Sequence, residues 1–157
     1  TSLAAGSAIQ DNVTGLMWEG KTTDGGLHDI NATFTWLNSS GATNGGAAGT
    51  ASGGVCAGVP AGCDTEKFVA AVNAEKLNGF SDWRLPTAQE LSSLVDSGDA
   101  SAPTIDAALA NQFAGEYWTA SPRAADVTGA WVVDFNSAAI AIAAKSSARR
   151  VRLVRGR

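Results

Sequence analysis

The sequence predicts an α+β fold with helices in its first half and a strand-rich second half. Two segments before residue 100 place apolar side chains at helical spacing behind a capping residue. From residue 116 onward the apolar spacing falls to two, which is typical of antiparallel strands with one buried face. A chain of 157 residues is long enough for one domain, and we expect a single domain over residues 1–157.

The first third of the chain combines short extended runs with a long polar segment. Residues 8–19 predict two extended runs that flank a polar Asp-Asn turn. Residues 20–37 are mixed and end in an amphipathic stretch around Trp36 that fits a strand or a helix. Residues 38–62 are dominated by Gly, Ala, Ser and Thr, so we expect nothing there to pack in a core. Because so long a segment without regular structure is unusual in a compact domain, we interpret it as an inserted loop.

A first helix is predicted to begin after Asp64. Asp64 and Thr65 are suited to cap it, and Asn78 and Gly79 supply a stop. The apolar side chains that recur on one face of this helix are Phe68, Val69, Val72 and Leu77.

A second helix carries the clearest local signal in the chain. Thr87 and Glu90 have the spacing of a capping box, in which a hydroxyl and a carboxylate each bond a free backbone N–H group. Its apolar residues at helical spacing are Leu91, Leu94 and Val95, and Gly98 is expected to end it. A further short helix is predicted between Pro103 and Phe113.

Four runs with a period of two predict the antiparallel strands of the second half. These runs are residues 116–121, 130–135, 138–143 and 150–155. The last run lies in residues 149–157, which hold five arginines and no acidic residue, whereas the preceding 148 residues hold 6 basic and 15 acidic groups. An acidic body disfavours general nucleic-acid binding, which needs a broad basic surface. We expect the arginines to pair with acids elsewhere in the domain, although a polyanion is a second candidate partner.

The two cysteines predict a local disulfide. Cys56 and Cys63 are separated by six residues in the Gly/Ala-rich loop, and a Cys-x-x-Cys redox motif is absent. His28, the single histidine, is far away in sequence, so we expect neither a metal site nor a cofactor. A disulfide implies an oxidising compartment, and therefore a secreted, periplasmic or cell-surface protein, of which we expect a secreted or cell-surface one.

Five stretches of the chain resemble the Lcl C-terminal domain family, whose name comes from a bacterial collagen-like adhesin. They occur in the order of the family and cover residues 11–19, 79–91, 117–121, 130–136 and 151–155. The Trp-Arg-Leu-Pro-Thr element followed by Glu-Leu is the most specific of them. The resemblance implies a C-type lectin-like fold, with the Gly/Ala-rich segment at about 38–63 as an insertion. It also implies surface binding, because collagen-like relatives bind sulfated glycosaminoglycans, and it brings no catalytic set.

The residue inventory agrees with a non-catalytic domain. His28 lies in a polar turn that predicts a surface position, and no Gly-x-Ser-x-Gly nucleophile elbow is present. Both cysteines lie in the insertion, whereas formylglycine-generating enzymes of the same group carry theirs in the C-terminal half. The acidic side chains of Asp96, Asp99 and Asp106 could supply oxygen ligands to calcium, but they lack the alternation of an EF-hand loop.

The tryptophans and the C-terminal basic residues have different expected roles. Four tryptophans in the family motifs are predicted to lie in the core, namely Trp18, Trp83, Trp118 and Trp131. In C-type lectin-like relatives the ligand face lies largely among the last strands. The ligand-binding candidates from this region are Arg123, Asp126, Asn136, Lys145, Arg150 and Arg152. Because Val151 and Leu153 would face the core, alternation predicts that Arg150 and Arg152 point outward and form a three-cation patch with Lys145.

Two functions from different classes follow. The leading one is an extracellular, non-catalytic binding module or adhesin that contacts a surface glycan, sulfated or not, or a protein ligand. The alternative is a structural subunit of a pilus, fibre or surface assembly, in which case the chain would form homo-oligomers. No apolar run approaches the roughly 20 residues of a membrane span, so we expect no membrane insertion by this segment. Whether a signal peptide, a collagen-like stalk or a pilin helix precedes Thr1 is open, as is glycosylation at Asn12, Asn31 or Asn38.

Overall fold

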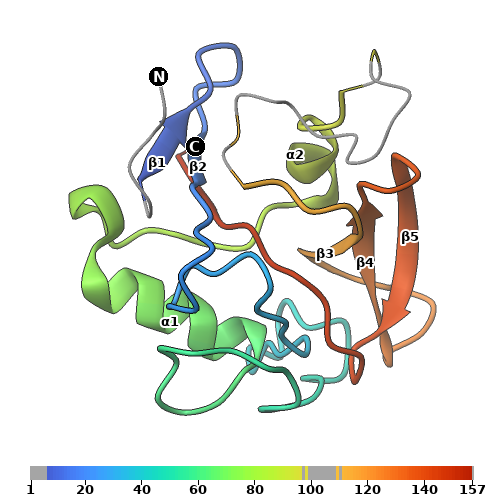
Figure 1. The fold of residues 1–157 in the computed structure, drawn as a ribbon. Helices are drawn as coiled ribbons and strands as arrows, with labels where there is room; N and C mark the ends of the chain where they lie inside the picture. The colour runs from blue at the N-terminus through green and yellow to red at the C-terminus, as the bar shows by residue number, and fades with distance from the viewer. Residues whose placement is uncertain (1–6, 97, 99–108, 110, 157) are drawn as a thin grey trace.

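The fold combines two small antiparallel sheets with two helices (Figure 1). A computed structural model of the chain describes residues 7–96, 98, 109 and 111–156. Within these residues it contains two α-helices, one short 3₁₀-helix and six strands, which confirms the predicted α+β class. Most of the predicted helix from Pro103 to Phe113 lies outside the described residues, and so do Asp99 and Asp106.

The first sheet joins the two ends of the chain. Its strands are β1 (Ala8–Gln10), β2 (Met17–Glu19) and β6 (Val154–Arg155), in the order β1-β2-β6. The turn between β1 and β2 is held by the Asp11 carboxylate, which accepts hydrogen bonds from the backbone N–H and hydroxyl groups that follow it. The predicted pair of extended runs around a polar turn is therefore confirmed.

The second sheet contains three of the four predicted strands. They are β3 (Glu116–Pro122), β4 (Gly129–Asp134) and β5 (Ala139–Ala144), in the order β3-β4-β5. The fourth prediction is wrong in its extent, because only Val154–Arg155 is regular and it belongs to the first sheet. The residues before it make single bridges, as at Tyr117 with Arg150. The segment changes partner along its length, so no continuous ladder forms.

Helix α1 (Thr65–Glu75) begins as predicted and ends slightly earlier. The Asp64 carboxylate accepts a hydrogen bond from the Lys67 N–H group at 2.9 Å and caps the helix. Lys76 then takes a left-handed conformation, with φ of 57°, and a 3₁₀ turn follows over Leu77–Gly79. The predicted stop at Asn78 and Gly79 thus lies in that extra turn.

Helix α2 (Ala88–Ser92) is shorter than predicted. Its capping box is confirmed, since Thr87 Oγ1 accepts from the Glu90 N–H at 3.2 Å and Glu90 Oε2 accepts from the Thr87 N–H at 2.8 Å. The helix ends well before Gly98 because the Ser93 hydroxyl bonds the Glu90 carbonyl at 2.6 Å. Leu94 and Val95 then continue in tighter i→i−3 turns.

The core consists of two adjoining apolar clusters. In the larger cluster Phe34 and Phe68 stack with their ring centroids 4.4 Å apart, and Trp36 and Trp118 are fully buried beside them. The smaller cluster lies between α2 and the second sheet and is built on Leu16, Trp18, Leu91, Tyr117 and Phe135. Of the four tryptophans predicted in the core, Trp18, Trp83 and Trp118 are buried. The prediction is wrong for Trp131, which is only half-buried, on the same face of β4 as the buried Val133.

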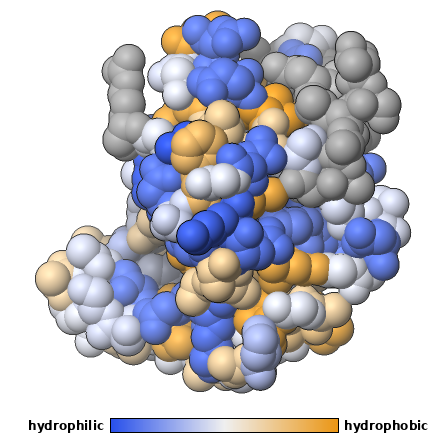
Figure 2. Space-filling model, turned by 90° about the vertical axis from the view of Figure 1, so that its left-hand side faces the viewer, coloured by the Kyte–Doolittle hydropathy of each residue, from blue (hydrophilic) through white to orange (hydrophobic). Residues whose placement is uncertain are grey.

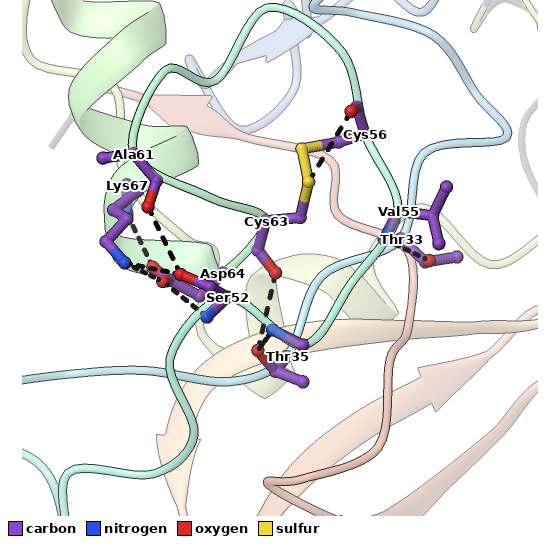
Figure 3. The surroundings of a disulfide bond; sticks show 10 residues. Thr33, Thr35, Ser52, Val55, Cys56, Ala61, Cys63, Asp64 and Lys67 are labelled. Carbon is purple, nitrogen blue, oxygen red and sulfur yellow. Dashed lines mark hydrogen bonds and ion pairs between the residues drawn. A yellow bond between two sulfur atoms is a disulfide. The ribbon is translucent and has the colours of Figure 1, made fainter.

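The Gly/Ala-rich insertion is anchored to the core, and the predicted disulfide holds it (Figure 3). Cys56 and Cys63 are joined with their Cα atoms 5.7 Å apart, and both pack against the larger apolar cluster together with Val59. The expectation that nothing in this segment can pack in a core is therefore wrong. Close backbone contact explains the glycines, because a Cβ atom on Gly54 would lie 2.0 Å from the Thr33 carbonyl oxygen.

The face over β1 and α1 carries a hydrophilic band across its middle (Figure 2). Hydrophobic residues appear on this face in patches separated by hydrophilic ones (Figure 2). The second sheet lies on the other side of the fold, with β5 outermost (Figure 1).

Candidate binding cleft

A cleft of about 660 Å³ opens between the start of α1, the segment that leads into α2, and β3. Its volume lies in the range typical of ligand sites. The residues that line it are Trp36, Leu37, Asn38, Thr65, Glu66, Val69, Arg84, Leu85, Thr87, Glu90 and Ala120. None of the six ligand-binding positions expected from the last strands lines the cleft, so we describe the cleft first and those positions after it.

One wall of the cleft is the Trp-Arg-Leu-Pro-Thr element, residues 83–87. Trp83 is buried, and its indole N–H donates to the Leu77 carbonyl at 3.2 Å. Asn73 of α1 holds the Trp83 backbone from both sides, with two hydrogen bonds of 2.8 Å. Arg84 then exchanges backbone hydrogen bonds with Val154 of β6. These contacts fix the position of the element between α1 and the first sheet.

Arg84 and Glu90 form a bidentate ion pair at the rim of this wall. The guanidinium donates to the two carboxylate oxygens at 2.8 and 2.7 Å. Hydrogen bonding from Arg84 lowers the pKa of Glu90 below its usual value, and Thr87 adds to the effect. Because both charges are engaged, Glu90 stays ionised near neutral pH and is not poised to act as a general acid.

The opposite wall comes from the first turn of α1. The Thr65 hydroxyl donates to the Leu37 carbonyl and accepts from the Leu37 N–H, each at 2.9 Å, so it fixes the segment that precedes the insertion. The Glu66 carboxylate accepts hydrogen bonds from Ser39 at 2.6 and 3.0 Å. Between the walls the half-buried side chains of Leu37, Val69 and Leu85 form an apolar floor.

The lining of the cleft contains few residue types that titrate. Among the described residues that line it there is no histidine, cysteine, lysine or aspartate. Its charged groups are Arg84, Glu66 and Glu90, so the lining carries one net negative charge. Trp36 is fully buried beneath the floor and donates its indole N–H to the Thr119 carbonyl at 2.9 Å, so it presents no open ring face. The cleft therefore suits an apolar group of a ligand whose adjoining groups are neutral or basic.

Three of the ligand-binding candidates from the sequence lie on surface turns away from the cleft. Arg123 and Asp126 form an ion pair of 3.6 Å in the turn between β3 and β4. Asn136 is exposed in the turn between β4 and β5, where its N–H group bonds Asp134 at 2.9 Å. Their role in ligand binding stays a prediction.

Lys145 was expected on the surface, and this expectation is wrong. Only 2% of the residue is exposed. Its ammonium group donates to the carbonyls of Asn44 and Ala47 at 2.8 and 2.7 Å and lies 4.4 Å from the centre of the Trp36 ring. Lys145 therefore holds the insertion onto the body of the domain.

Arg152 was expected to point outward with Arg150, and this expectation is wrong for Arg152. Arg152 is fully buried and donates to the Glu19 and Asn111 carbonyls at 2.8 and 3.1 Å. Arg150 is partly covered, since it lies over the Phe113 ring and donates to a backbone carbonyl. The segment lies between other elements on both sides, so strand alternation does not expose one face. The predicted three-cation patch is consequently absent among the described residues.

The sequence reasoning also missed a buried charged cluster around Glu19. One Glu19 oxygen accepts hydrogen bonds from Lys21 at 2.7 Å and from His28 at 2.8 Å, and the other accepts from the Leu153 N–H at 2.9 Å. The prediction of a surface His28 is wrong, because the residue is 8% exposed and its other ring nitrogen contacts Glu75. Glu19 and Lys21 are two residues apart on an extended segment, which was the one available sign that they share a face.

Opposing effects set the pKa values in this cluster. Burial alone would lower the pKa of His28, but hydrogen bonds and negative charge from Glu19 and Glu75 outweigh it and raise the pKa. Burial likewise would raise the pKa of Glu19, but Lys21 and His28 outweigh it and lower the pKa. Within the described residues no group of acidic, histidine or cysteine side chains is arranged to hold a metal ion. The contacts of the cluster therefore hold β2 and the loop that follows it against α1 and the C-terminal segment.

Comparison with known protein families gives a match over most of the chain. The family model described as the Lcl C-terminal domain matches residues 7–155. Comparison with curated proteins produced no match. Among the described residues, no helix has the length and apolar character that a membrane crossing requires.

Proposed function

We propose, because the chain belongs to the Lcl C-terminal domain family, that it is a non-catalytic, adhesin-type binding domain. The disulfide between Cys56 and Cys63 supports placing it in an oxidising compartment, secreted or at the cell surface. Arg123, Asp126 and Asn136 stay candidates for a second contact with the ligand, since their turns are on the surface. We treat the chain as one domain with an insertion at about 38–63.

The observation that carries the proposal is the composition of the cleft. Its most specific wall is the family's Trp-Arg-Leu-Pro-Thr element, and the charged groups there are paired with each other, as Arg84 is with Glu90. A site whose one cation is already paired with a carboxylate is suited to bind a ligand by shape and apolar contact, beside Glu66, which has no cationic partner among the described residues. This arrangement favours a binding role over a catalytic one.

A protein segment is the ligand that the cleft suits best. The lining is negative by one charge, which repels a sulfated polysaccharide, and burial of Lys145 and Arg152 removes two of the cations expected to attract one. A neutral sugar would gain from an exposed aromatic face, and Trp36 offers none. We therefore propose that the cleft accepts an apolar side chain of a surface protein, next to a lysine or arginine that faces Glu66.

We also propose that the fold is similar to the C-type lectin-like group. Support comes from the pairing of the first strands with the last, from the two helices, and from the separate antiparallel sheet formed by the second half of the chain. In this interpretation the insertion is an addition to the loop region that precedes α1.

The test is a pair of matched substitutions on one helix. Val69→Arg places a large cation on the floor of the cleft, whereas Ala70→Arg places the same group on the neighbouring, exposed position of α1. Peptides selected on the parent protein from a random phage-displayed library serve as the probe, and their affinity is measured by calorimetry. We expect selected peptides to join an apolar residue to a basic one, and Val69→Arg to weaken their binding about tenfold or more.

The same series of measurements contains the control and the result that would contradict the proposal. Ala70→Arg should bind the peptides as the parent does, and both variants should keep the parent's circular dichroism spectrum. Equal binding by the parent and Val69→Arg would exclude the cleft as the site. If the parent binds heparin and Val69→Arg binds it equally well, the ligand face lies instead on the loops around Arg123 and Asn136.

A further inference from the structure

The outer edge of the second sheet is open at β5. On the opposite edge, β3 is covered by the C-terminal segment, because Trp118 N–H donates to the Arg150 carbonyl at 2.9 Å and Arg150 N–H donates to Glu116 at 3.2 Å. β5 pairs with β4 alone, and no other strand in the described part of the chain pairs with its far side. Within the described residues, the sheet therefore ends at a strand whose outward backbone groups pair with no other strand.

The register identifies which backbone groups point outward. Lys145 N–H donates to the Thr128 carbonyl at 2.8 Å at the end of the β4–β5 ladder. Bonded and non-bonded pairs alternate along an antiparallel ladder, so the backbone groups of Ala139, Ala141 and Ala143 face β4. Those of Ile140 and Ile142 consequently face away from the sheet.

The side chains of β5 do not protect this edge. Natural edge strands carry charges, prolines or bulges that prevent pairing with another chain, whereas residues 139–144 consist of alanine and isoleucine alone. Ile140 and Ile142 are 50% and 38% exposed, and Ile142 lies opposite the half-buried Trp131 of β4. An apolar strip thus runs along an edge that can still form hydrogen bonds.

We propose that this edge pairs with the same edge of a second copy of the chain, antiparallel and with a two-fold axis at Ala141. Residues 139–143 read Ala-Ile-Ala-Ile-Ala in both directions, so the edge is complementary to itself. In this register Ile140 lies opposite Ile142 of the second copy, and the two such pairs form four N–H···O bonds. Ala141 lies opposite its own counterpart in a non-bonded pair.

Self-complementarity distinguishes a second copy from an unrelated strand. The pairing creates one six-stranded sheet in which the four isoleucines form a single apolar patch of two cross-strand pairs, with the Trp131 side chain of each copy beside its own Ile142. The chain carries a net charge of −4, but β5 contains no charged residue. Pairing of two β5 edges therefore brings no like charges of these strands together. None of the β5 residues lines the cleft, so the dimer does not depend on the proposed ligand and would present two clefts to a surface.

Sedimentation equilibrium of the disulfide-intact chain, from micromolar to hundreds of micromolar, tests the association. We expect a monomer–dimer equilibrium in the parent and in Ile142→Val. Ile142→Pro removes an outward N–H without removing a bond to β4, and we expect it to weaken dimerisation about tenfold or more. Ile140→Lys should also weaken dimerisation, because it places a charge in the apolar contact between the two edges. This second variant keeps the test valid if the proline variant does not fold. A monomeric parent, or association unchanged in the folded edge variants, overturns the proposal.

Cysteine cross-linking tests the register. In a non-bonded antiparallel pair the Cα atoms are about 4.5 Å apart, within the range of a disulfide. Ala141→Cys should therefore give a covalent dimer on a non-reducing gel under mild oxidation. Ala139→Cys is the matched control, because its two copies would lie about 13 Å apart along the strands, and it should stay largely uncross-linked. Equal cross-linking at both positions overturns the two-fold register.

Discussion

Glu19, Lys21 and His28 show how much a residue's behaviour depends on its surroundings. Each would be an ordinary surface group in an extended chain, but here Lys21 and His28 both contact Glu19 in the interior. Removing charges from water is costly, so such a cluster persists only when every member keeps its partners. The cluster joins β2, the loop that follows it, α1 through Glu75, and the C-terminal segment through Leu153.

Stability should depend on pH through His28. Its pKa is raised in the folded protein, so its stabilising effect is fully present below the unfolded value of about 6.5 and is lost as pH rises through the higher folded value. We expect the difference in free energy of unfolding between the parent and His28→Gln to shrink as pH rises above about 6.5. Urea unfolding at a series of pH values from weakly acidic to alkaline measures it. A difference that does not vary with pH would contradict this role.

Lys145→Met isolates the hydrogen bonds that hold the insertion. Methionine keeps an apolar stem near Trp36, but it leaves the carbonyls of Asn44 and Ala47 without the ammonium donor. We expect a loss of about 1–3 kcal/mol in the free energy of unfolding, with faster hydrogen exchange in residues 44–50. Arg123→Ala is the control, since its exposed ion pair with Asp126 should contribute little to stability. Equal effects of the two substitutions would mean that the Lys145 contacts are weak.

Among the helices and strands, α2 depends most for its stability on the contacts at its N-terminus. Five residues are too few for a helix to be stable through its own backbone bonds, so the capping box and the ion pair between Arg84 and Glu90 have a large share in holding it. The same residues form one wall of the cleft. Local capping and ligand-site geometry are therefore coupled in this short stretch.

Thr87→Ala should destabilise the domain by about 1 kcal/mol, because it removes the side-chain acceptor of the cap. Thr87→Ser keeps that acceptor and should stay close to the parent. The midpoint of urea unfolding measures both. If Thr87→Ala unfolds at the same midpoint as the parent, the capping box does not contribute to stability.

At the scale of the whole molecule, the C-terminal segment unites the fold. Residues 149–155 contact the segment before the insertion at Phe34, β3 at Tyr117, and both β2 and Arg84 at Val154. Four consecutive residues of this segment, 151–154, are buried. The two sheets share no strand, so this segment is a principal connection between them.

Removing residues 149–157 should abolish cooperative folding. The deletion exposes the core side chains that 151–154 cover and leaves Glu19 without the Leu153 N–H group. A chain that ends at Gly156 is the control and should unfold in one transition like the parent. Near-ultraviolet circular dichroism and thermal unfolding measure the outcome. A sharp transition in the chain lacking 149–157 would show that the rest of the domain folds without this segment.

The sequence by itself determined the features whose contacts are local. The capping box and the Asp11 turn each join residues three apart, and the disulfide closes a short loop, so residue types at fixed spacing were enough to predict them. The strands β3, β4 and β5 also follow from alternation, because each joins its neighbour through a short turn. The family resemblance found the Trp-Arg-Leu-Pro-Thr element but indicated a scaffold role for it.

Only the tertiary structure decided the positions of Lys145, Arg152 and His28 and the shape of the cleft. Lys145 bonds a carbonyl 101 residues away and Arg152 one 133 residues away, and no local pattern encodes such partners. Alternation predicts an exposed face only where one side of a strand meets water, and the segment around Arg152 is covered on both sides. The walls of the cleft come from segments far apart in the chain, so their meeting depends on how the helices and sheets pack together.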